Sequence, residues 1–137
     1  MQRNINVADI RVESAEHVNK LGDEELSAIL TDAKDKLPRL VTRYAKEMEV
    51  SYEKVFVKAQ KTRWGSCSSK GNINLNCLLM IVPPYVRKYV IVHELAHRRE
   101  MNHSDRFWKV VADEIPDYQK AVKWLKKNGD ALIGRLP

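Results

Sequence analysis

Val55, Val57 and Ala59 occupy every second position in one region of the chain, and Ile73 and Leu75 do so in another, which continues into an apolar run at residues 78–82. This period of two is typical of strands that bury one face. A turn-rich stretch at residues 66–72, with the sequence SCSSKGN, separates the two regions. The pattern therefore predicts a small antiparallel sheet.

A helical spacing of apolar residues begins at Asp23, and the acidic residues Glu24 and Glu25 follow it directly. Aspartate is a favourable N-cap, and acidic residues stabilise the first turn of a helix. We expect Pro38 either to kink this helix or to begin a second helical segment, which continues to Met48.

Three further helices are predicted in the second half of the chain. Pro83 and Pro84 end the sheet region and, because proline is tolerated in a first helical turn, open a helix through residue 97. Ser104 can cap a short helix, and Asp117 can cap a last one that Gly129 stops.

The chain has the length of one domain and shows no internal repeat, low-complexity segment or linker. Residues 1–12 alternate weakly, which predicts a short strand within an N-terminal arm that extends to residue 23. We therefore expect a single α+β domain spanning residues 1–137, with a small antiparallel sheet packed against several helices.

The chain has 24 basic and 18 acidic residues, and its net charge of +6 favours association with anionic partners. Such a surface can associate weakly with nucleic acid. A solvated face that keeps a small protein soluble is the favoured explanation, since no nucleic-acid-binding module is recognisable. The basic clusters are Lys58, Lys61 and Arg63; Arg87 and Lys88; Arg98 and Arg99; and Lys123, Lys126 and Lys127.

The chain contains no run of eighteen apolar residues and begins with no signal-peptide pattern, so we expect a cytoplasmic protein without membrane insertion. Its two cysteines, Cys67 and Cys77, are too few for a disulfide scaffold and lack the CxxC spacing of a zinc ribbon. We expect both to be reduced thiols.

The segment VHELAH at residues 92–97 carries the clearest chemistry. A helical residue advances about 100°, so His93 and His97 lie on one face, about one turn apart, where two imidazoles can hold one ion. Glu94 lies close enough to that face to reach a water on the ion, which is the general-base position of zinc proteases. Zinc lowers the pKa of such a water, and the carboxylate can remove its proton.

A catalytic zinc normally takes three protein ligands, and His103 is the predicted third. The stretch before it can end the helix and turn back, with Asn102 in the left-handed conformation. Glu100, Asp105 and Glu114 remain alternative third ligands, and Glu114 is the strongest of the three.

The ordinary alternative is that the histidines and Glu94 are surface residues on the polar face of an amphipathic helix and bind no metal. The preceding turns are strongly apolar, however, with Tyr85, Val86, Tyr89, Val90 and Val92. The helix is therefore expected to be buried, and buried imidazole or carboxylate groups need a partner or a metal. This context favours a metal site.

Several segments together resemble the YgjP-like family of zinc metallopeptidases. They are KTRWGSCS at 61–68, GNINLN at 71–76, VIVHELAH at 90–97, and NHS at 102–104 with Phe107 and Trp108. The resemblance spans about residues 24–129. It implies a zincin-like fold, a zinc ion held by His93, His97 and His103, and Glu94 as general base. The family is distantly similar to the SprT-like proteases, which act on DNA-associated proteins.

Trp64, Gly65, Ser66 and Cys67 are the predicted substrate-binding residues. Zincins often bind a peptide as an extra strand on a sheet edge near the metal, and a glycine there would allow a close backbone approach. Trp64 can equally be a core residue. Tyr85, Tyr89 and Tyr118 are candidates for stabilising the oxyanion, although core packing is the stronger expectation for each.

The sequence thus predicts a zinc-dependent hydrolase, and the favoured interpretation is a metallopeptidase that cleaves peptides or proteins. The alternative is a binding module for nucleic acid or a DNA-associated protein, with a structural zinc site and little or no catalysis. A zinc hydrolase of non-peptide amides also fits the motif.

Overall fold

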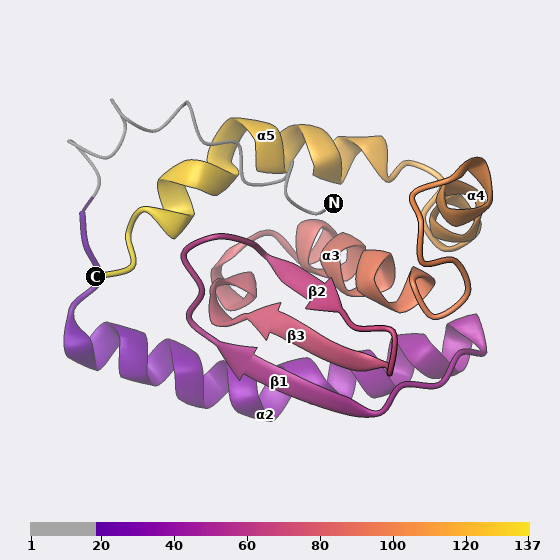
Figure 1. Cartoon of the computed structure of the whole chain (residues 1–137). Helices are drawn as coiled ribbons and strands as arrows, with labels where there is room; N and C mark the ends of the chain where they lie inside the picture. The colour runs from indigo at the N-terminus through magenta and orange to yellow at the C-terminus, as the bar shows by residue number, and fades with distance from the viewer. Residues whose placement is uncertain (1–18) are drawn as a thin grey trace.

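The computed structural model describes residues 19–137, so the strand predicted at residues 1–12 lies outside the described part. Within residues 19–137 one α-helix is followed by three strands, a 3-10 helix and three more α-helices, and this separation of strands from helices confirms the α+β class (Figure 1). The helices are α2 (Asp23–Met48), α3 (Pro84–Ala96), α4 (Asp105–Glu114) and α5 (Gln119–Ile133), with the 3-10 helix η3 at Cys77–Ile81. The strands are β1 (Lys54–Lys58), β2 (Gly65–Cys67) and β3 (Asn72–Asn76).

The sheet is mixed and has the order β1-β3-β2. Strand β2 pairs antiparallel with β3, as predicted, but β1 pairs parallel with β3, so the fully antiparallel arrangement is wrong. The Asn76 side-chain amide donates to the carbonyls of Gln60 and Arg63, at 2.8 and 3.1 Å. These bonds hold the β1–β2 connection across the end of β3. The chain therefore reaches the far side of β3 before it forms β2.

The expected second strand is shorter than its apolar run. It ends at Asn76, whose side-chain oxygen accepts a hydrogen bond from the Leu78 backbone at 3.0 Å and so caps η3. Residues 77–81 are thus helical rather than extended, because this cap turns the chain away from the sheet.

Helix α2 is continuous through Pro38, so the second helical segment predicted to begin there is wrong. Its buried positions Ala33, Leu37, Val41 and Ala45 follow one face on both sides of the proline. Packing of this face against the core supplies most of the stability of such a helix, so it outweighs the missing backbone donor. The helix begins one residue earlier than expected, with Gly22 as N-cap, and the Gly22 amide donates to the Glu25 carboxylate at 3.0 Å.

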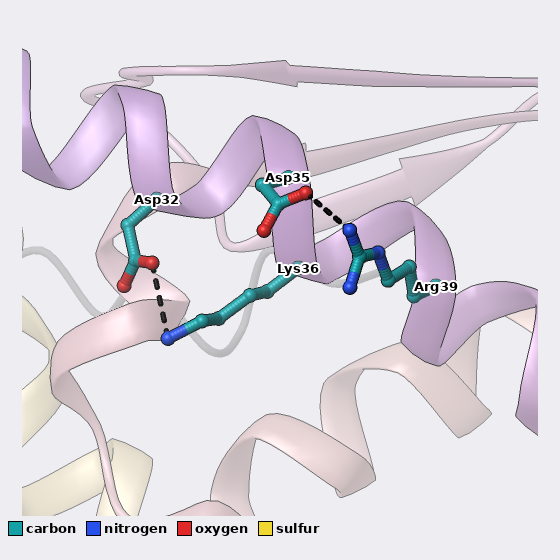
Figure 2. Close-up of polar contacts among 4 residues, drawn as sticks. All are labelled: Asp32, Asp35, Lys36 and Arg39. Atoms are coloured by element: carbon teal, nitrogen blue, oxygen red, sulfur yellow. Dashed lines mark hydrogen bonds and ion pairs between the residues drawn. The ribbon is translucent and has the colours of Figure 1, made fainter.

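The solvent side of α2 carries ion pairs one turn apart, shown in Figure 2. Asp32 pairs with Lys36 at 3.1 Å, and Asp35 pairs with Arg39 at 2.7 Å. All four side chains are well exposed, so each pair stabilises the helix by only about 0.3–0.5 kcal/mol. The basic residues of this helix are therefore partly balanced within the helix itself.

Helix α3 lies at the centre of the molecule. It contacts α2, α4, α5, β2 and β3, and every residue from Tyr89 to Ala96 is buried. Pro84 is its first residue, which confirms the predicted start. Because α3 is enclosed by elements from both halves of the chain (Figure 1), its polar side chains are withdrawn from bulk water.

Helix α5 covers α3 and extends beyond Gly129, which does not stop it. Ala121, Leu125, Gly129 and Ile133 are spaced four residues apart and are all buried. Gly129 thus belongs to the face that packs against the core. No helix among the described residues is long and apolar enough to cross a membrane.

Candidate metal centre

Two neighbouring positions of α3 carry buried polar groups. His93 is 2% exposed and Glu94 is fully buried. His97 follows directly after the last residue of the helix, on the same face as His93, and is 6% exposed. The apolar sequence around these residues buries the helix, and this burial carries the three polar side chains into the interior.

His93, His97 and His103 converge on one point. Each offers a ring nitrogen, and these three atoms all lie within 4.8 Å of one another. Their ring centroids are separated by 5.2 Å for the pairs 93–97 and 93–103 and by 4.8 Å for the pair 97–103. Three imidazoles so placed can hold one metal ion and leave a coordination position open.

The His97 ring is oriented by the backbone that follows the helix. Its Nδ1 lies 3.1 Å from the Glu100 carbonyl oxygen, which can only accept a hydrogen bond. Nδ1 therefore carries the proton, and Nε2 keeps its lone pair for a metal. Hydrogen bonds of this kind fix the tautomer and direction of metal-binding histidines.

His103 comes from the loop before α4 and is exposed. Ser104 is the N-cap of α4, as predicted, and its hydroxyl accepts a hydrogen bond from the Phe107 backbone amide at 3.4 Å. Asn102 does not adopt the left-handed conformation, since Glu49 is the one non-glycine residue with positive φ among residues 19–137. His103 instead reaches the site from the loop that leads into the Ser104 cap of α4, without a left-handed residue.

Phe107 and Trp108 form an aromatic support for the histidines. The Phe107 ring is fully buried, and its centroid lies 4.9, 4.5 and 4.8 Å from those of His93, His97 and His103. Trp108 stacks on His103 with centroids 6.0 Å apart. We predicted the helix that bears these rings but not their contact with the ligands; their spacing of four and five residues from His103 was the available signal.

Burial sets the proton affinity of the site. It lowers the pKa of His93 to about 3 and also lowers that of His97, so both rings are neutral at pH 7. Burial raises the pKa of Glu94 to about 8, although the charges of His97 and Arg63 act in the opposite direction. The site thus combines neutral nitrogen ligands with a carboxyl group of unusually high proton affinity.

Glu94 lies directly against strand β2. A Cβ atom on Gly65 would come 3.1 Å from Glu94 Cγ and 3.2 Å from its Oε2. The carboxylate also lies near the first ligand, with Oε2 3.4 Å from His93 Nδ1. Only glycine therefore fits at this point without displacing either Glu94 or the β3 carbonyl of Asn74, which lies 3.1 Å from the same position.

The other predicted substrate-binding residues lie partly in the core and partly on strand β2. Trp64 is fully buried, so its side chain packs in the core. Ser66 and Cys67 are half-buried on β2. Burial and the nearby Glu94 raise the pKa of Cys67 to about 11, which keeps this thiol protonated at neutral pH.

The carboxylates considered as third ligands do not join the three histidines. Glu114 lines a separate pocket of about 210 Å³ together with Met48, Arg99 and other residues at the end of α2. Glu100 contributes its backbone carbonyl to His97, and Asp105 lies in the first turn of α4. The cluster of potential metal ligands within residues 19–137 is the histidine triad.

Two of the candidate tyrosines take part in the aromatic packing. Tyr89 is buried, contacts His93 edge to face at 5.6 Å and stacks with Tyr118 at 6.3 Å. Burial raises the pKa of Tyr89. Tyr118 is half-buried and also stacks on Trp108 at 5.2 Å, whereas Tyr85 is exposed beneath the ammonium group of Lys120. Core packing thus accounts for Tyr89.

Comparison with known proteins gives a consistent picture. The sequence profile described as "YgjP-like, metallopeptidase domain" matches residues 3–128. The fold is similar to the metallopeptidase zymogen of Pyrococcus abyssi abylysin, with 22% identity, a TM-score of 0.55, and coverage of 66% of this chain and 89% of that one. It is also similar to the metallopeptidase zymogen of Methanocaldococcus jannaschii jannalysin, with 17% identity, a TM-score of 0.57, and coverage of 65% and 91%. No curated protein matches the chain.

Proposed function

The chain belongs to the YgjP-like metallopeptidase family, and from this membership we propose that it is a zinc-dependent peptidase in which Glu94 is the general base. The convergence of His93, His97 and His103 beside a buried glutamate is the observation that carries the proposal. The family and the triad establish a metallopeptidase with a three-histidine metal site; zinc, the ligand roles and the substrate contacts are the proposed part.

The donor set suits zinc. Three imidazoles are borderline-soft ligands that zinc accepts in catalytic sites with three protein ligands. When bound, zinc would polarise the substrate carbonyl and lower the pKa of a water molecule. His93, His97 and His103 would hold the ion, and the Glu100 carbonyl would keep the His97 ring in position.

Glu94 would move the proton. Its carboxylate would accept a proton from the attacking water and then donate it to the leaving amine, which is the usual course of general acid–base catalysis. In the metal-free protein burial raises the pKa of Glu94 to about 8, and a bound cation beside it would lower this pKa and favour the carboxylate form that accepts the proton. The close contact with Gly65 would keep the carboxylate in a single orientation.

Strand β2 is the proposed binding edge for a peptide. It pairs with β3 on one side, and within the sheet of residues 19–137 it has no strand on the other. The backbone bonds Asn76 N to Trp64 O and Ser68 N to Asn72 O show which β2 residues face β3. By the antiparallel alternation, the amide and carbonyl groups of Gly65 and Cys67 point to the free edge. A substrate strand could pair with these groups next to Glu94.

Metal analysis and peptide hydrolysis test this function together. The wild-type protein should contain one zinc per chain and cleave an unstructured protein such as casein. Glu94→Gln should keep its zinc while hydrolysis falls by about a thousandfold or more. His103→Ala should lose most of its zinc. Full hydrolysis by Glu94→Gln would exclude Glu94 as the base, and full zinc retention by His103→Ala would exclude His103 as a ligand.

A further inference from the structure

Arg98 follows the ligand His97 and leaves the metal-binding helix toward the sheet. Its Nε donates to the Ser51 carbonyl at 2.8 Å, and its Nη1 donates to the Ser69 carbonyl at 3.3 Å. Ser51 precedes β1, and Ser69 lies in the turn between β2 and β3. One guanidinium group therefore joins the end of α3 to two separate segments of the sheet region.

The turn between β2 and β3 is shaped to receive this guanidinium. Gly71 has φ +94°, and a Cβ atom there would lie 2.9 Å from Arg98 Cζ. Gly71 also closes the turn, because its amide donates to Ser68 and its carbonyl accepts from the Glu53 amide, at 2.9 and 2.8 Å. The glycine thus serves the turn conformation and the close approach of Arg98 at once.

The charge of Arg98 is directed at backbone carbonyls. Within residues 19–137 it forms no ion pair with an acidic side chain. The next residue, Arg99, behaves similarly but reaches another segment, since its Nη2 donates to the Met48 carbonyl at the end of α2 at 3.0 Å. Hydrogen bonds from a guanidinium are stronger than neutral ones, and its planar fork can serve two acceptors.

Strand β2 lies between two contacts with the metal-binding helix. At its start, Gly65 lies so close to Glu94 that a Cβ atom would crowd the carboxylate, and just beyond its end the turn binds Arg98. The strand has only three residues, Gly65–Cys67, and its pairing with β3 ends at the bond between Ser68 and Asn72, inside the turn. The Arg98 contact lies next to this end of the strand.

We propose that Arg98 is a positioning residue, which holds the β2–β3 turn against the end of the metal-binding helix and thereby sets the substrate-binding edge relative to Glu94. This role rests on the proposed pairing of a peptide with β2. It concerns substrate placement, so it predicts a change in binding of the peptide more than in the chemical step.

Hydrogen exchange tests the proposal without any substrate. In zinc-loaded Arg98→Ala, amides of residues 65–72 should exchange about tenfold faster than in the wild type, while those of residues 86–95 keep their protection. Arg99→Ala is the matched control and should leave residues 65–72 unchanged. Unchanged exchange at 65–72 in Arg98→Ala, or equal acceleration in all segments, would overturn the proposal.

Peptide kinetics provide a second test. For Arg98→Ala the KM should rise about tenfold while kcat stays within about threefold, because substrate placement is lost and the chemistry remains. Arg98→Lys keeps a positive charge but lacks the planar fork of the guanidinium, so its KM should lie between those of the wild type and Arg98→Ala. Added ethylguanidinium should lower the KM of Arg98→Ala and leave that of Arg99→Ala unchanged.

The outcomes separate the two proposals. A purely structural role for Arg98 would reduce the active fraction, which lowers kcat at constant KM and gives no rescue; that result would overturn the positioning role. If the wild type cleaves no peptide, the proposed function fails, and the hydrogen-exchange result alone decides the role of Arg98.

Discussion

Glu94 is the one acidic side chain among residues 19–137 that is fully buried. Moving a carboxylate from water into the interior is unfavourable, and the raised pKa of Glu94 reflects this cost. A hydrophobic residue at this position would pack without that cost. Placing the carboxylate there thus lowers the stability of the metal-free fold in exchange for a proton acceptor beside the metal ligands.

This cost gives a prediction for Glu94→Gln in the metal-free protein. Glu94 loses its proton near pH 4.5 in the unfolded chain but near pH 8 in the folded one. Its contribution to stability is therefore fully present below about pH 4.5 and is lost as the pH rises to about 8. Between pH 5 and 8 the wild type should lose on the order of 3–4 kcal/mol more stability than Glu94→Gln.

Urea denaturation of both proteins at the two pH values, with a chelator present, measures this difference. The cost of burying the glutamine amide in Glu94→Gln does not depend on pH. It therefore cancels when the stability of this variant at pH 5 is subtracted from its stability at pH 8. The buried histidines are present in both proteins, and the coupling between His97 and the charge of Glu94 belongs to the measured difference. Parallel pH profiles for wild type and Glu94→Gln would show that Glu94 is not protonated in the folded, metal-free state.

Trp108 gives a second prediction at this scale. His103 is exposed, and stacking on Trp108 restricts its ring. Trp108→Ala should weaken zinc binding by about ten- to a hundredfold, as expected for residues that orient a ligand. Trp108→Phe should bind zinc more tightly than Trp108→Ala. Competition with a zinc chelator measures both affinities.

Trp124→Ala is the matched control for Trp108→Ala, because Trp124 is a half-buried tryptophan of α5 that lines a different surface groove. Its zinc affinity should equal that of the wild type. If Trp108→Ala also binds zinc with wild-type affinity, the stacking does not position His103.

Among the elements, α2 shows most directly that tertiary packing can override a local preference. The buried face continues past Pro38, and the Thr42 hydroxyl donates to the Pro38 carbonyl at 3.0 Å. A proline in a helix interior still removes one backbone hydrogen bond and is less favourable than alanine. The α2 helix is therefore less stable than its length and packing would allow.

Pro38→Ala should for this reason stabilise the protein, by roughly 1–2 kcal/mol. The measurement is the free energy of unfolding in urea. Ser27→Ala, at an exposed position of the same helix, is the control and should change stability by less than about 0.5 kcal/mol. A destabilised Pro38→Ala would mean that the proline ring packs in a way that alanine cannot replace.

At the scale of the whole molecule, the two ends of the described chain are tied together, as Figure 1 shows on the side of the C-terminus. The Leu21 amide and the Lys20 ammonium donate to the carbonyls of Arg135 and Gly134, both at 2.8 Å. Leu21 and Leu136 are buried. The tail after α5 is thus part of the core, although the family profile ends at residue 128.

Leu136→Ala should accordingly destabilise the protein by about 2–3 kcal/mol, since it removes buried methyl groups and leaves a cavity. Thermal or urea unfolding measures the loss. Ile81 is an apolar residue that is 37% exposed, so Ile81→Ala should cost clearly less. Equal losses for the two variants would show that the tail does not pack on the core in solution.

Regular periodicity and short spacings in the sequence were sufficient to predict a large part of the site and of the fold. The positions of α3 and α4, the shared face of His93 and His97, and the Ser104 cap follow from interactions between residues no more than four apart. Such local interactions depend little on the rest of the chain. The amino-acid sequence by itself therefore determined where α3 and α4 begin and the candidate catalytic motif.

Other features depend on the path of the chain through space. The parallel pairing of β1 with β3, the place of Gly65 against Glu94, and the contact of Arg98 with Gly71 join residues that are far apart in the sequence. The choice of His103 over Glu114 likewise depends on how α4 packs against α3. Alternation shows which face of a strand is buried but not which strand lies beside it. Only the tertiary structure decided these contacts, because each requires two distant segments to be brought together by the packing of the whole core.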